Sequence, residues 1–144
     1  MHAMTRQRFL QQYANTNVQT AVESATPHRL VQMLYEGALD RIAQAKGAMM
    51  RKDFEAKSKL TNRVIDILSA LRGGLDLERG GEVATNFEAL YTFMIEQVFK
   101  ASRNNSPEVL EEVAEILRTI KSGWDEMPDE FRKMRKEQID RLAA

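Results

Sequence analysis

Four stretches of this chain place apolar residues at helical spacing, and that periodicity limits the fold more than any other feature. In the first stretch, apolar side chains recur at steps of three and four from Leu30 to Met49. The three later stretches repeat the pattern. Such steps put side chains on one face of an α-helix, and no stretch shows the sustained alternation expected of a strand. The pattern therefore predicts an all-α protein.

Capping residues indicate where each helix begins and ends. Ser, Thr and Asp side chains accept hydrogen bonds from the free amides of a first helical turn, and Pro suits the first helical position. The expected starts are Thr26-Pro27, Asp53 and Ser106-Pro107, and the expected ends are Gly73-Gly74, Asn104-Asn105 and Met127-Pro128. We expect residues 73–81, with the sequence GGLDLERGG, to form a loop that the third helix follows.

Four helices joined by short loops predict an antiparallel four-helix bundle. At 144 residues the chain suits one such domain. We expect the bundle at residues 26–127. Residues 1–25 are polar and predict a mobile N-terminal arm with an apolar cluster that includes Leu10 and Tyr13. Residues 128–144 predict a charged tail that could include a short C-terminal helix.

Composition argues against several classes of function. The chain has 21 basic and 21 acidic side chains, so no summed positive charge favours nucleic acid or a membrane surface. No apolar run approaches the roughly 20 residues of a membrane span. The sequence has no cysteine and only two histidines, His2 and His28, which leaves no set of metal ligands. The glycine-rich loop lacks the Lys-Ser/Thr pair of a phosphate-binding loop. We therefore expect no enzyme activity, no metal and no cofactor.

The width of each apolar stripe indicates how much of a helix needs cover. The stripe of the fourth helix falls within roughly 120°, which one face against a core requires. Those of the second and third helices span roughly 160° and 180°. This surplus favours a surface that binds another polypeptide. Two alternatives use the surplus equally well: a central third helix with several neighbours, and a self-associating bundle, such as a homodimer, with a structural or adaptor role.

Residues at the edges of the two wide stripes are the predicted partner contacts. They are Ile65 and Leu68 in the second helix, and Tyr91, Ile95 and Phe99 in the third. An amphipathic partner helix lying in a groove would contact such residues every three or four positions.

Several motifs, taken in order, resemble a known family. Tyr13 with Val18, Ser24-Ala25-Thr26-Pro27, and the run from Met33 to Ala38 are similar to the opening of the FliS family, the flagellar export chaperones of flagellin. The run from Gly74 to Asn86 with Leu90-Tyr91 resembles the middle signature, and Glu111-Glu112-Val113 leading to Trp124 resembles the end. The resemblance covers about residues 10–127. Residues 101–105 differ from the family's usual Ala-Asn-Leu pattern, and the tail after Pro128 matches poorly.

The resemblance implies a function and partners that the residues alone do not establish. It implies a helical bundle in the bacterial cytoplasm that binds the disordered C-terminal segment of flagellin, prevents its premature polymerisation and assists its secretion. It further implies delivery to the flagellar export gate and, in some members, contact with an anti-sigma factor. Leu10 and Tyr13 match positions of an arm that covers part of the groove when flagellin is absent.

Overall fold

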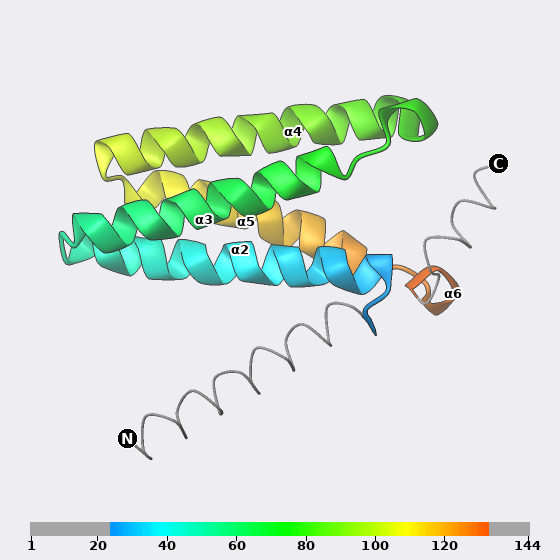
Figure 1. Cartoon of the computed structure of the whole chain (residues 1–144), viewed down its shortest axis with the longest axis horizontal. Coiled ribbons are helices and arrows are strands. Elements are labelled where there is room, and N and C mark those ends of the chain that lie inside the picture. Colours follow the sequence, from blue (N-terminus) through cyan, green and yellow to red (C-terminus); the bar gives the residue numbers. More distant parts are fainter. Residues whose placement is uncertain (1–23, 133–144) are drawn as a thin grey trace, which may run out of the picture.

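The structure, a computed structural model, describes residues 24–132, and four long helices make up most of this range. They are α2 (Pro27–Met50), α3 (Phe54–Gly73), α4 (Leu77–Asn104) and α5 (Pro107–Asp125), and the short helix α6 (Asp129–Arg132) follows. Residues 24–132 contain no strand. The long helices run antiparallel to their neighbours in the chain (Figure 1). The prediction of an all-α four-helix bundle is confirmed.

Most of the predicted arm and tail lies outside the described residues, since residues 1–23 and 133–144 are not among them. The predictions for Leu10 and Tyr13 therefore also lie outside the described range. Helix α6 occupies the beginning of the predicted tail and contacts α2. Among residues 24–132, no helix has the length and apolar character that a membrane crossing requires.

The predicted capping residues begin three of the four long helices. The hydroxyl of Thr26 accepts a hydrogen bond from the Arg29 amide at 3.2 Å. The carboxylate of Asp53 accepts from the Ala56 amide at 3.2 Å, and the Ser106 hydroxyl accepts from the Val109 amide at 3.3 Å. At the C-terminus of α4, Asn105 adopts the left-handed conformation common at helix ends, with φ of 50°. These local predictions are confirmed. Capping was predictable because it depends only on residues within one turn of the helix end.

The prediction for residues 73–81 is wrong in part. Helix α4 begins inside this segment at Leu77, where the Asp76 carboxylate accepts a hydrogen bond from the Arg79 amide at 3.0 Å. The helix is then broken at Gly81, whose φ of 56° and ψ of −134° are not helical. Glycine tolerates this conformation because it has no Cβ. The segment thus forms a single helical turn, Leu77–Gly80, placed ahead of the long part of α4.

The four long helices form a ring around one core. Helix α3 packs between α2 and α4, and α5 packs against the same two helices from the other side. Side chains from all four helices fill the centre. The largest that are fully buried include Tyr35, Ile42, Leu68, Met94 and Leu117.

The two ends of the bundle differ. At the closed end, residues 51–53 join α2 to α3 and residues 105–106 join α4 to α5. There the Asn105 side chain donates to the Met49 carbonyl at 3.3 Å, and the Lys57 ammonium donates to the Ser102 carbonyl at 2.9 Å. At the open end, the chain reaches the long part of α4 only after the turn that ends at Gly81. This difference determines where a cavity can form.

Candidate partner-binding site

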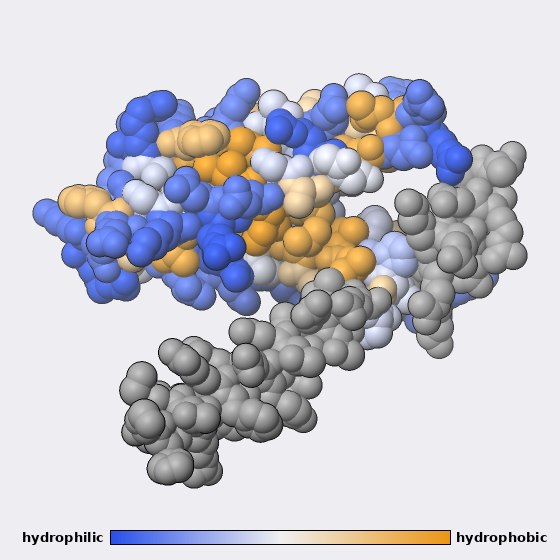
Figure 2. Space-filling model, viewed as in Figure 1, coloured by the Kyte–Doolittle hydropathy of each residue, from blue (hydrophilic) through white to orange (hydrophobic). Residues whose placement is uncertain are grey.

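An apolar cavity of about 250 Å³ lies at the open end of the bundle. All four long helices and the α3–α4 connection line it. The lining residues are Val31, Leu34, Tyr35, Ala70, Leu71, Gly74, Leu75, Phe87, Tyr91 and Trp124. We call this feature the end cavity. Figure 2 shows apolar surface gathered in the hollow between α4 and α2, on the side where α3 ends.

The helical repeat explains how the end cavity receives its lining. Val31, Leu34 and Tyr35 follow one another at steps of three and one, which places them on one face of α2. On α4, Phe87 and Tyr91 are four residues apart and so lie one above the other. Their rings are 6.0 Å apart between centroids. The cavity is therefore a continuation of the core stripes at a level where facing side chains do not meet.

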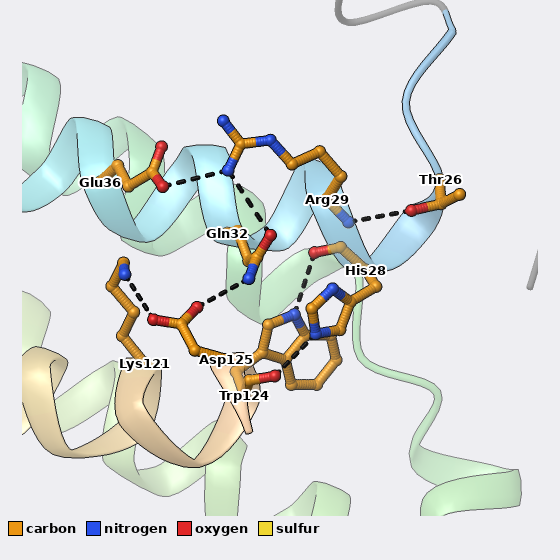
Figure 3. Close-up of polar contacts among 8 residues, drawn as sticks. All are labelled: Thr26, His28, Arg29, Gln32, Glu36, Lys121, Trp124 and Asp125. Atoms are coloured by element: carbon orange, nitrogen blue, oxygen red, sulfur yellow. Dashed lines mark hydrogen bonds and ion pairs between the residues drawn. The ribbon is translucent and has the colours of Figure 1, made fainter. Parts of the chain in front are cut away.

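His28 and Trp124 join α2 to α5 beside the end cavity (Figure 3). The Nε2–H of His28 donates to the Trp124 carbonyl at 2.7 Å, and the Nε1–H of Trp124 donates to the His28 carbonyl at 2.9 Å. The two rings are stacked with centroids 5.1 Å apart. His28 is buried, which the sequence did not suggest for a residue in the first turn of a helix. Its contact with Trp124 fixes the indole ring that forms one wall of the cavity.

Asp125 extends this contact along the seam of α2 and α5 (Figure 3). Its carboxylate accepts hydrogen bonds from Lys121 at 2.5 Å and from the Gln32 amide at 2.7 Å. Hydrogen bonding from Lys121 is the largest cause that holds the pKa of Asp125 below its ordinary value. The seam is therefore polar at the surface and apolar on the side that faces the cavity.

Two buried tyrosines connect α2 with α4 across the ring of helices. The hydroxyl oxygens of Tyr35 and Tyr91 lie 2.7 Å apart, at hydrogen-bonding distance, and both residues line the end cavity. Burial raises the pKa of Tyr35 and of Tyr91 above the ordinary value of a phenol. Both hydroxyls consequently keep their protons at neutral pH.

The residues predicted as partner contacts fall into different environments. Tyr91 lines the end cavity. Leu68 is fully buried and Ile95 is 7% exposed, so both belong to the core of the bundle. Ile65 is partly buried against that core, whereas Phe99 is 52% exposed. The structure therefore does not bring the five together into one surface.

The wide stripe of α4 leaves several large apolar side chains exposed, whereas in α3 only that of the first residue, Phe54, is exposed. Val83, Phe93 and Phe99 of α4 are each about half exposed or more. In α3, Ile65 and Ile67 instead pack against the core, because this helix has both α2 and α4 as neighbours. The interpretation of unused apolar surface therefore applies mainly to α4.

Most residues of the end cavity were not predicted from the sequence. Val31, Leu34 and Leu71 have the spacing of ordinary core residues, and Trp124 continues the apolar row of the fourth helix. One signal could have located them. In an antiparallel bundle, the glycine-rich segment at residues 73–81 must lie at the same end as the start of the first helix and the end of the fourth. The glycine-rich segment therefore marks the end of the bundle at which the cavity lies.

Comparison with known proteins places this architecture in a family. The family model described as "Flagellar protein FliS" matches residues 9–130, which is most of the chain. The chain belongs to the FliS family. The match includes all four long helices and every residue that lines the end cavity.

Individual relatives of this FliS-family chain agree. The chain is 39% identical over 125 residues to a flagellar secretion chaperone FliS of Vibrio cholerae, covering 87% of this chain and 92% of the relative. It is 42% identical to a flagellar secretion chaperone FliSB of Pseudomonas aeruginosa, covering 87% and 97%. A FliS of Salmonella typhimurium is 37% identical, covering 80% and 86%. All three relatives are named flagellar secretion chaperones, which supports a role in export. The family is one of chaperones and not of enzymes.

Proposed function

We propose that this protein is a cytoplasmic export chaperone that binds the disordered C-terminal segment of flagellin. Bound flagellin folds into helices against apolar surface on the bundle, and its polymerisation segment is masked until export. Membership of the FliS family supports the export role. The observation that carries the binding mode is the end cavity, an apolar space open at one end of an otherwise filled core.

Helix-in-groove recognition accounts for binding without a covalent step. An amphipathic segment places apolar anchors every three or four residues, and one such anchor fills the end cavity. Further anchors contact the exposed apolar side chains of α4, among them Phe93 and Phe99. The segment loses conformational entropy as it folds, which lowers its affinity per unit of buried area and favours later release at the export gate.

The earlier contact predictions keep different roles in this proposal. A partner in the end cavity can contact Tyr91. Phe99 is exposed to solvent and can be contacted from outside. Contact with Ile65, Leu68 or Ile95 requires the helices to separate, because the bundle covers them. The arm with Leu10 and Tyr13 stays a prediction, as does contact with an anti-sigma factor.

Co-elution with flagellin tests the proposal. Full-length flagellin should co-elute with the protein, and flagellin without its last forty or so residues, about two 20-residue helices, should not. Equal co-elution of both forms would contradict the proposal. Sedimentation of the protein alone and with flagellin separates this function from the self-associating alternative, which predicts a homodimer in both samples.

Two matched variants test the place of binding. Leu75→Asp puts a charge at the end cavity, in the connection between helices, and should weaken binding of full-length flagellin. Met50→Asp puts the same charge on a side chain that is 77% exposed at the closed end, and should leave binding unchanged. Equal affinities of the two variants would show that flagellin binds elsewhere.

A further inference from the structure

The two tyrosines that line the end cavity carry one more hydroxyl proton than the hydrogen bond between them uses. Each tyrosine hydroxyl carries one proton and can also accept. The bond between Tyr35 and Tyr91 uses the proton of only one of them, whichever it is. Among the described residues, neither hydroxyl has another hydrogen-bonding partner. One phenolic proton is therefore left over, and this count does not depend on how either hydroxyl is rotated.

Other N–H groups of the lining residues already donate hydrogen bonds within the protein. The indole N–H of Trp124 donates to the His28 carbonyl. The amides of Gly74 and Leu75 donate to the carbonyls of Ala70 and Arg72. The leftover phenolic proton consequently stands out in a lining that is otherwise aliphatic and aromatic. A buried donor without a partner is unfavourable, so an occupant that offers an acceptor gains over one that does not.

We propose that the end cavity selects a side chain with an apolar body and a neutral oxygen acceptor, which receives the leftover proton of the Tyr35–Tyr91 pair. Glutamine, asparagine and tyrosine have this character. A carboxylate does not, because burying an unpaired charge is costly. The cavity is large enough for such a side chain. An engineered cavity of about 150 Å³ holds benzene, and the end cavity has about 250 Å³. The inference rests on the proposed function for the identity of the client, but its chemistry can be tested without flagellin.

Two small molecules of similar shape provide the test. Acetophenone and isopropylbenzene share a ring and a branched substituent, and only acetophenone has an oxygen acceptor. Binding of each is followed by NMR through the indole N–H resonance of Trp124, the sole tryptophan of the chain, which lies in the cavity wall. The quantity of interest is the ratio of the two affinities, compared between the wild-type protein and its variants.

The double variant Tyr35→Phe with Tyr91→Phe removes both hydroxyls, and each single variant leaves one hydroxyl with a free proton. We expect the preference for acetophenone to fall about fivefold in the double variant, the effect of one neutral hydrogen bond, and to persist in both single variants. An unchanged ratio in the double variant would overturn the proposal. Failure of both molecules to bind the wild-type protein at millimolar concentration would also overturn it.

Two controls separate recognition from a structural effect. The urea midpoint of the double variant should equal or exceed that of the wild type, because both partners of a buried hydrogen bond are removed together. A lower midpoint together with lost preference would assign the tyrosines a structural role and overturn the proposal. Independently of any variant, the carbonyl stretch of acetophenone bound to the wild-type protein should lie below its frequency in an apolar solvent. A bound band at the apolar-solvent frequency would contradict the inference.

Discussion

His28 and Trp124 exchange hydrogen bonds in both directions although they are 96 positions apart in the sequence. A carbonyl oxygen can only accept, so the bond from His28 to the Trp124 carbonyl requires the proton to be on Nε2. The stacked rings then place the indole N–H of Trp124 toward the His28 carbonyl. No loop joins α2 to α5, and this contact ties the start of one helix to the end of the other.

The reciprocal bonding predicts that Trp124→Phe destabilises the bundle. The phenyl ring can still stack on His28, but it cannot donate to the His28 carbonyl. We expect the free energy of unfolding to fall by about 1–2 kcal/mol from the lost hydrogen bond and the smaller ring. Urea denaturation of both proteins measures the difference. An unchanged midpoint would show that stacking alone joins the two helices.

Ile95 and Phe99 lie one turn apart on α4 and should respond differently to the same substitution. Ile95→Asp buries a carboxylate in the core, so we expect a loss of several kcal/mol, about 3 or more, or an unfolded protein. Phe99→Asp alters a half-exposed side chain and should change the free energy of unfolding by less than about 1 kcal/mol. Thermal unfolding followed by circular dichroism compares them. Similar losses would mean that Phe99 is also part of the core.

Gly81 should resist replacement, whereas Gly123 should not. Gly81→Ala forces a Cβ onto a residue with φ of 56° and ψ of −134°, at an expected cost of about 1–3 kcal/mol. Gly123 lies inside α5, where an added Cβ meets no atom within 4 Å. Gly123→Ala should therefore stabilise the protein by about 0.5–1 kcal/mol through its helix propensity. Denaturation midpoints that move in the same direction would contradict the role assigned to the break in α4.

Glu111 should make stability depend on pH in the acidic range. Hydrogen bonds from Arg118 at 2.8 Å and Lys46 at 2.6 Å lower its pKa from 4.5 to about 2. Because the pKa is lower in the folded state, its contribution is present above pH 4.5 and is lost as the pH falls toward 2. We expect the wild type to be more stable than Glu111→Gln at neutral pH, and the difference to disappear near pH 2. A difference that stays constant with pH would contradict the assignment.

The helices were predictable from the sequence because their signals are local. Thr26, Asp53 and Ser106 act on amides three residues away, so their roles follow from the sequence alone. The start of α4 was predicted wrongly. The glycines around residues 73–81 suggested a continuous loop, but Asp76 caps a separate turn and only Gly81 interrupts the helix. Composition alone does not distinguish a loop from a helix broken at one residue.

The candidate site was less predictable, since the width of a stripe does not reveal the number of its neighbours. Leu68 and Ile95 were chosen from wide stripes, yet they are buried because α3 and α4 each contact two other helices. The end cavity depends on how side chains from four helices meet at one level of the bundle. Trp124 lines it partly because His28 fixes its indole ring. Such a contact between distant positions cannot be inferred from spacing along one helix.

The unequal ends of the bundle have a consequence for dynamics. Short connections and buried hydrogen bonds hold the closed end, so its amide protons should exchange with solvent only through rare, cooperative opening. At the open end, hydrogen bonds between His28 and Trp124 tie α2 to α5, whereas α3 reaches the long part of α4 only through the turn Leu77–Gly80. The amides of this connection should therefore exchange more readily through local fraying. Under the proposed function, the connection between α3 and α4 is the part that gives way as a client helix enters or leaves, while the opposite end keeps the fold.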